Sequence, residues 1–161
     1  MIKTNIIITI LLIACISLIK CDTPANCTYE DIRGTWVFHE GPRGNDKTVN
    51  CSANVNITSG LVLTLEFPNI ATDENGNVGF WTIIYNQGFE VVINNRKYFA
   101  FSLYEQNGQN VTSYCTHTFW GWAHGTGVNP SDWSCYIGAK LDSQAKPKVY
   151  EVKKSNSLLE T

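Results

Sequence analysis

The sequence predicts an all-β fold, an antiparallel up-and-down β-barrel of about eight strands whose interior is filled by side chains. Short runs of aromatic and β-branched residues recur along the chain, as they do in strands, and turn-forming residues separate them. No convincing stretch has the apolar periodicity of a helix. Aromatic residues make up 12% of the chain, which supplies large side chains to fill a closed sheet.

The strand-like segments follow one another at short intervals. They lie at residues 35–39, 61–67, 79–85, 89–94, 97–105, 111–121 and 133–141. Turn formers stand at residues 75–76, 86–88, 94–96 and 107–109. Because tight loops join short strands, we expect a meander, and a meander can bury its edges by closing into a barrel.

Tryptophan is the natural filling of such a barrel. The chain has five, at positions 36, 81, 120, 122 and 133. Packing in the core and at the rim is the favoured interpretation, because one buried aromatic ring removes ~150–250 Å² from water. An open ligand cavity is the alternative, since Gly34-Thr35-Trp36 also matches the short G-x-W pattern of lipocalins, which are barrels with a pocket.

Residues 1–21 have the organisation of a secretory signal peptide. Lys3 supplies a positive n-region, and the roughly 14 residues from 6 to 19 form an apolar core that is too short for a comfortable membrane span. A retained signal anchor is the alternative, with Lys20 at the membrane boundary. We expect the mature chain to begin at Asp22 and to contain no membrane segment.

The mature chain suits one secreted domain with two disulfides. Twelve basic residues less Lys3 and Lys20 leave ten against 14 acidic residues, a net charge of −4, which gives no support for nucleic-acid binding. Four cysteines remain, and their pairing has three alternatives that the sequence alone leaves open. No two of them form a close C-x-x-C pair, so we expect no zinc site.

The composition changes after residue 141. Residues 143–161 are rich in lysine and have Tyr150 as their only aromatic residue. This composition favours a detached, disordered tail over a further strand. The folded domain is therefore expected at residues 22–142.

Known catalytic motifs are absent from the sequence. It contains no G-x-S-x-G elbow, no P-loop and no H-E-x-x-H motif. His39, His117 and His124 have no carboxylate or cysteine at ligand spacing, so they are interpreted as surface or capping residues. We therefore predict no metal site in this chain.

Four N-x-S/T sequons predict glycosylation in the secretory pathway. They begin at Asn26, Asn50, Asn56 and Asn110. The last lies in the expected hairpin around residues 107–109. A sugar there would stand near the tip of that hairpin.

Several sequence blocks, in one order, resemble the exclusion domain of cathepsin C, also called dipeptidyl peptidase I. The blocks are DTPANCTY at 22–29, GTWVF at 34–38, VNCS at 49–52, GFWTIIYNQGFE at 79–90, KYFAF at 97–101, TSYC at 112–115, and GW at 121–122 followed by W-x-C at 133–135. The resemblance runs from residue 22 to about 142 and includes all four remaining cysteines. It implies a side-chain-filled β-barrel, with the start of the propeptide at 143–161.

The resemblance also implies roles for particular residues. Asp22 matches the N-terminal aspartate whose carboxylate binds the substrate's ammonium group. Disulfides would join Cys27 to Cys115 and Cys51 to Cys135. Asn26 and Asn50 match glycosylation positions of the family. A projecting hairpin blocks the cleft in the family, and its matching residues here are Leu103, Tyr104, Glu105, Asn107, Gly108 and Tyr114.

The function implied is that of a non-catalytic specificity domain of a lysosomal or secreted cysteine peptidase. Its partners would be the papain-like catalytic chains and the N-terminus of a peptide substrate. The full family enzyme is a tetramer and uses chloride, whereas no cofactor is expected in this chain. No papain-type cysteine run is present, so the chain is expected not to be an enzyme by itself. The alternative is a free-standing, calycin-like secreted barrel that binds a small ligand or inhibits a cysteine peptidase.

Overall fold

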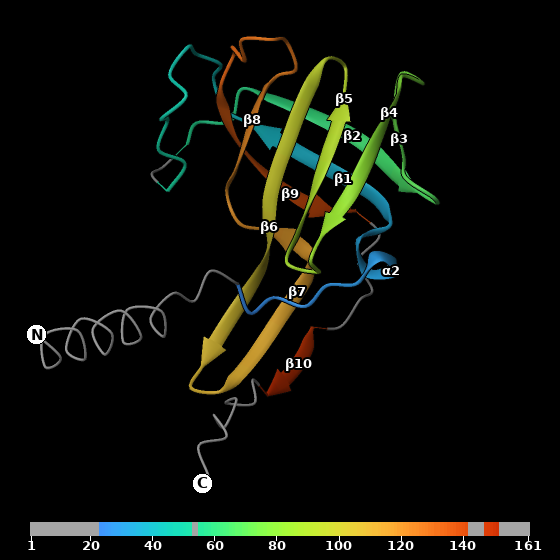
Figure 1. Ribbon diagram of the computed structural model, residues 1–161, viewed down its shortest axis with the longest axis vertical. Helices are drawn as coiled ribbons and strands as arrows, with labels where there is room; N and C mark the ends of the chain where they lie inside the picture. Colours follow the sequence, from blue (N-terminus) through green and yellow to red (C-terminus); the bar gives the residue numbers. More distant parts are fainter. Residues whose placement is uncertain (1–22, 53–54, 142–146, 152–161) are drawn as a thin grey trace, which may run out of the picture.

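The computed structural model describes residues 23–52, 55–141 and 147–151, which form one short helix and ten strands (Figure 1). The elements are α2 (Tyr29–Ile32), β1 (Gly34–Glu40), β2 (Ser59–Glu66), β3 (Ile70–Asp73), β4 (Val78–Ile84), β5 (Gly88–Ile93), β6 (Arg96–Asn107), β7 (Asn110–Thr118), β8 (Gly121–Gly125), β9 (Ser134–Lys140) and β10 (Lys148–Glu151). Within these residues no helix is long and apolar enough to cross a membrane.

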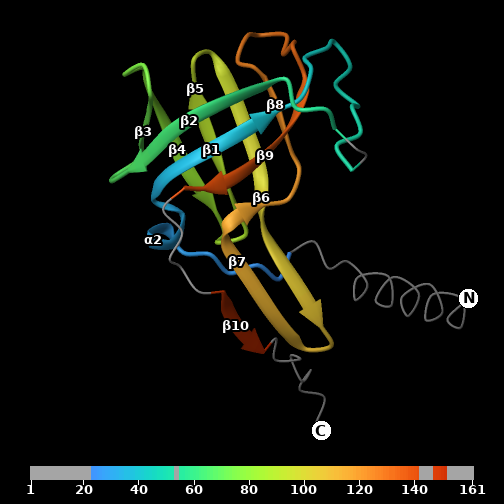
Figure 2. The same cartoon turned by 180° about the vertical axis from the view of Figure 1, so that it is seen from behind.

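Eight of the strands form a closed antiparallel barrel. Neighbours pair in the order β1-β2-β3-β4-β5-β6-β8-β9, and β9 returns to pair with β1, from Trp36 opposite Lys140 to Glu40 opposite Tyr136. This last pairing removes the free edges of the ring. The all-β barrel predicted from the sequence is thereby confirmed, and Figures 1 and 2 show it from opposite sides.

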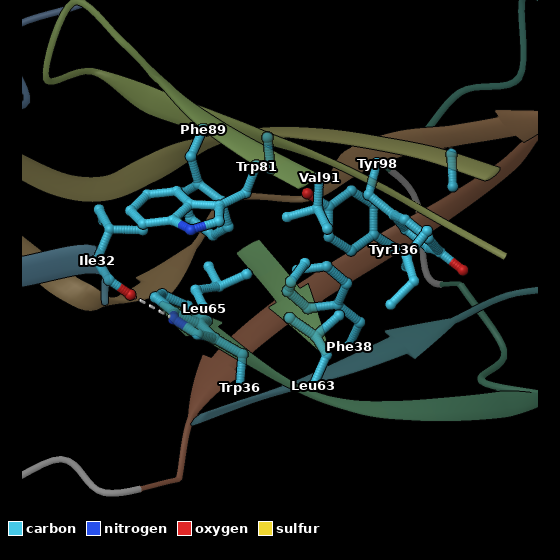
Figure 3. Packing of buried hydrophobic residues seen from close by; sticks show 14 of the residues in the cluster. Ile32, Trp36, Phe38, Leu63, Leu65, Trp81, Phe89, Val91, Tyr98 and Tyr136 are labelled. Carbon is cyan, nitrogen blue, oxygen red and sulfur yellow. Dashed lines mark hydrogen bonds between the residues drawn. The ribbon is translucent and has the colours of Figure 1, made fainter. Parts of the chain in front are cut away.

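Aromatic side chains fill the barrel interior (Figure 3). Trp36 packs on Phe89 with ring centroids 4.9 Å apart, and Phe38 packs on Tyr136 at the same separation. All four side chains are fully buried. Strand alternation explains this, because every second residue of a barrel strand points inward. The interior is a packed core, as predicted.

The tryptophans divide between the core and the rim. Trp36 and Trp81 are buried, and each indole N–H donates to a backbone carbonyl, that of Ile32 at 2.7 Å and that of Glu66 at 3.0 Å. Trp122, in contrast, is 40% exposed. The division into core and rim packing agrees with the interpretation favoured by the sequence.

One polar cluster is buried in the barrel. Arg96 on β6 donates to Glu40 on β1 at 2.6 Å, and both side chains are about 5% exposed. Ser134 on β9 donates to the same carboxylate at 2.6 Å, and the Asp132 carbonyl accepts from Arg96 at 3.0 Å. A buried charge is tolerated only when it is paired and hydrogen-bonded. The cluster therefore links three strands of the ring.

Four elements differ from the sequence expectation. The sequence predicted no strand at β3 or at β8, because its segment at 111–121 covers most of β7 and only the first residue of β8. The helix α2 has only four residues, too few to produce a periodic pattern. Strand β10 lies within the segment whose composition favoured a detached tail, and it pairs with β7 along four residues.

Strand β6 leaves the barrel partway along its length. Its first half pairs with β5 and β8, whereas Leu103 to Asn107 pair with β7. The register shifts between Ser102 and Leu103, because Ser102 pairs with Thr118 and Leu103 with Tyr114, so residues 115–117 of β7 have no partner in β6. As a result the β6–β7 hairpin projects from the barrel, and β10 lies beside it (Figures 1 and 2).

Both disulfides implied by the family resemblance are present. Cys27 is bonded to Cys115, and Cys51 to Cys135, across 88 and 84 residues of sequence. In the chain-entropy model, closing loops of this length restricts the unfolded chain by up to about 4–5 kcal/mol each. The first bond ties the N-terminal segment to β7. The second ties the loop after β1 to β9.

Gly121 is required where β8 packs against β6. A Cβ at this position would lie 2.2 Å from the carbonyl oxygen of Phe99. We predict that Gly121→Ala lowers the free energy of unfolding by about 1–3 kcal/mol, because backbone on both strands must move. Gly127→Ala is the matched control, since nothing lies within 4 Å of its Cβ. Denaturant unfolding of both variants measures the effect, and equal midpoints would contradict the prediction.

Candidate functional site

The projecting hairpin has two different faces. Paired residues of an antiparallel ladder share a face, and the face alternates along each strand. Glu105 pairs with Thr112 and Asn107 with Asn110, so these four residues lie on one face. Val111 and Ser113 lie on the other. We call the first the polar face and the second the covered face.

The polar face carries most of the hairpin residues that the sequence singled out. Glu105, Asn107 and Gly108 are exposed, whereas Leu103, Tyr104 and Tyr114 are half-buried. A shallow hollow is lined by residues of this region: Glu105, Gln106, Asn107, Asn110 and Thr112. Gly108 has φ +62°, a left-handed conformation suited to the tight turn after β6.

Glu105 and Tyr114 form a hydrogen bond across this face. The Tyr114 hydroxyl donates to the Glu105 carboxylate at 2.9 Å. The two residues are diagonal neighbours on adjacent strands, within reach of a long side chain. The hydrogen bond to the carboxylate holds the phenol in its protonated form and raises the pKa of Tyr114 above 10, aided by desolvation and by the charge of Glu105.

The N-terminal segment lies against the covered face. The Asn26 amide donates to the Ser113 hydroxyl at 3.1 Å, and the Cys27–Cys115 disulfide follows at once in the chain. Both Val111 and Ser113 are fully buried. The Cys27 amide also donates to the Asn86 carbonyl, at 2.7 Å. Two connections therefore fix the segment to β7, and a third fixes it to the turn between β4 and β5.

Asp22 lies outside the described residues. Its neighbour Thr23 is placed, and the Thr23 amide donates to the side-chain carbonyl of Gln87 at 3.3 Å. The described segment thus starts beside the turn between β4 and β5, close to the residues that hold Asn26 and Cys27. The role of Asp22 remains a prediction.

Asp31 in α2 organises contacts that the sequence analysis missed. Its carboxylate accepts from the Thr28 amide at 2.7 Å and from the Thr28 hydroxyl at 2.5 Å. The same carboxylate forms an ion pair with Lys148 of β10. The sequence Thr28-x-x-Asp31 is a capping-box-like signal, and it was the one clue to this helix.

The four predicted glycosylation residues are all exposed in the structure. Asn26 and Asn50 each accept one hydrogen bond, from the Asn86 side chain at 3.3 Å and from the Ser52 amide at 2.9 Å. Asn110 lines the hollow on the polar face. Exposure makes all four accessible for modification, and their use stays a prediction.

The histidines do not gather into a metal site. Among the described residues no three His, Cys, Asp or Glu side chains are grouped so that they could hold a metal ion. His39 and His117 are exposed, and the ring of His124 packs on Trp133 with centroids 4.3 Å apart. The candidate site therefore consists of the polar face of the hairpin and of the N-terminal segment that packs on its covered face.

The fold and the site define a side-chain-filled, disulfide-linked β-barrel domain with a projecting hairpin. Residues 22–140 match the family described as the cathepsin C exclusion domain, and the chain belongs to this family. It is also 44% identical over 117 residues to cathepsin C of Schistosoma mansoni. That match covers 73% of this chain and 24% of the relative, so the chain spans about a quarter of the relative's length.

The Glu105–Tyr114 contact gives a testable property of the polar face. We predict that Glu105→Gln lowers the pKa of Tyr114 towards 10, because a neutral amide no longer opposes formation of the phenolate. Ring signals of isotope-labelled tyrosine, followed by NMR across an alkaline titration, measure this pKa. Glu74→Gln, at another exposed position, should leave it unchanged. An unshifted Tyr114 in the Glu105 variant would show that the two side chains do not interact.

Proposed function

We propose that this chain is the exclusion domain of a papain-like dipeptidyl peptidase and that it limits the substrate cleft to two residues. In this proposal the β6–β7 hairpin is the wall of the cleft and the carboxylate of Asp22 binds the substrate's free ammonium group. One observation carries the proposal. The same strand, β7, forms the projecting hairpin and fixes the N-terminal segment, through Cys115 and Ser113.

The physical requirement for dipeptide removal is a fixed distance between an anionic anchor and the scissile bond. A carboxylate about 4 Å from an ammonium group gains ~4 kcal/mol at an effective dielectric constant of 20, before desolvation is subtracted. Such an anchor fixes the number of residues that are removed only if its position is rigid. The disulfide at Cys27 and the Asn26–Ser113 hydrogen bond supply rigidity five and four residues after Asp22.

The domain is proposed to act with papain-like catalytic chains and to be non-catalytic itself. The full family enzyme is a tetramer that uses chloride, and we extend both properties to the assembly that would contain this chain. The lysosome or the extracellular space is the proposed location. Four exposed sequons and two disulfides support passage through the secretory pathway.

One carboxylate of the β3–β4 region is held in its charged form by hydrogen bonds. Hydrogen bonds from the side chains of Asn94 and Asn77 lower the pKa of Asp73 to about 2. Because the folded pKa lies below the ordinary 3.8, the stabilisation is present above pH 3.8 and is lost only as the pH falls through about 2. At the mildly acidic pH of a lysosome this carboxylate therefore stays charged and bound.

A peptidase inhibitor is the second candidate function, and the projecting hairpin favours it. A hairpin that blocks a cleft from within one assembly can also block it as a separate molecule. Inhibition of a papain-like endopeptidase by the isolated chain distinguishes the two. A small-ligand carrier is disfavoured, because aromatic side chains occupy the barrel interior.

Asp22→Asn tests the anchor in an enzyme assembled from residues 22–161 and the catalytic part of the Schistosoma mansoni relative. We predict a loss of at least tenfold in kcat/KM on a dipeptide amide with a free amino group, because an amide cannot pair with the ammonium. On the acetylated substrate the two enzymes should be equal. Glu74→Gln is the charge-matched control. Equal constants on the free-amine substrate would remove Asp22 from the proposal.

Shortening the hairpin tests the wall. Replacing residues 105–112 by a two-residue turn removes the projection and leaves both cysteines of the Cys27–Cys115 bond in place. We predict that the assembled enzyme then cleaves internal bonds of an N-acetylated peptide, because longer chains can pass. Mass spectrometry of the products detects this. Continued release of dipeptides alone would mean that the hairpin is not the wall.

A further inference from the structure

The outer edge of β7 is occupied by another segment of the same chain. β10 pairs with it antiparallel, with Lys148 opposite Ser113, Val149 opposite Thr112, Tyr150 opposite Val111 and Glu151 opposite Asn110. Figures 1 and 2 show β10 beside β7 and away from the barrel ring. β10 therefore makes the β6–β7 hairpin into a three-stranded sheet.

One side chain of β10 is recognised by a preorganised partner. The ammonium group of Lys148 forms an ion pair with the Asp31 carboxylate, which Thr28 already holds with two hydrogen bonds. Burial opposes ionisation of Asp31, but the hydrogen bonds from Lys148 and Thr28 lower its pKa below the ordinary value. The carboxylate is thus fixed and charged at the end of the β7–β10 ladder where Lys148 pairs with Ser113.

The next residue of β10, Val149, does not bury its side chain against the hairpin. Val149 is 69% exposed, and Lys148 itself is 45% exposed. The described contacts of β10 are therefore the backbone ladder and the basic group, as in strand addition to an exposed sheet edge. An unpaired edge of this kind is a template for any extended segment that satisfies its donors and acceptors.

We propose that the outer edge of β7 at residues 110–113, together with Asp31, is a docking edge for an extended peptide that carries a basic residue opposite Ser113. Its occupant in this chain is the segment 148–151. Because the segment belongs to the same chain, its effective concentration at this edge is high, and this favours the paired state. The site uses the edge of β7 that does not pair with β6, and it shares residues 110–112 with the proposed cleft wall.

The first test is hydrogen exchange in the full chain. The variant is the double substitution Lys148→Glu/Val149→Pro, in which the new glutamate repels Asp31 and the proline disrupts the ladder. We expect the edge-facing amides in 110–113 to exchange at least tenfold faster in this variant than in the wild-type chain. Exchange in β1 and β9 should be unchanged, which controls for folding. Equal exchange in the two proteins would overturn the proposal. Protection that rises with protein concentration would also overturn it, because the strand would then come from a second copy.

The second test supplies the ligand separately. We expect the labelled peptide PKVYEV, residues 147–152, to bind the vacated double variant at least tenfold more tightly than the wild-type chain, whose edge is filled. The peptide PEVYEV should bind at least tenfold more weakly than PKVYEV. Introducing Asp31→Asn into the double variant should abolish this difference. Equal binding of the two peptides, or NMR shifts that avoid residues 110–113, would refute a docking edge that selects a basic residue.

Discussion

The change of partner along β6 is the constraint on which the rest of the structure depends. Up to Phe101 this strand is a member of the barrel, and from Leu103 it belongs to the hairpin. The register shift between Ser102 and Leu103 lies within one continuous twelve-residue strand, which therefore belongs to both sheets. The Phe119 amide donates to the Phe101 carbonyl at 2.9 Å, which closes the junction where β7 returns to the barrel. The direction of the hairpin is therefore set by the barrel wall.

The packed interior makes the barrel a rigid support. The Glu40–Arg96 pair joins β1 to β6, and the rings of Trp36, Phe38 and Phe89 pack against one another inside the barrel. Closely packed cores deform little, so a displacement at the hairpin is resisted by the whole ring. The Cys27–Cys115 bond extends this rigidity to the N-terminal segment. A segment held in this way keeps a fixed distance from the hairpin, which a frayed terminus cannot do.

Much of this fold was accessible from the sequence, because alternation and turn formers report directly on antiparallel strands. β3 was missed because Ile70–Asp73 is too short to show alternation, and β8 because only two residues separate it from β7. β10 was missed because its partners, β7 and Asp31, are distant in sequence, and composition does not reveal such contacts. The hairpin was predicted as a hairpin from its residues, but its selection as a site came from family resemblance. A polar tip is what any surface hairpin shows.

The surroundings of β7 show where a partner can approach. One edge of the strand pairs with β6 and the other with β10, and the N-terminal segment packs on the covered face. The polar face with Glu105, Asn107 and Asn110 is the remaining side. A cleft pressed against this face and a glycan on Asn110 would compete for the same space, because a sugar is bulky. Use of that sequon and close packing of the proposed wall therefore exclude each other.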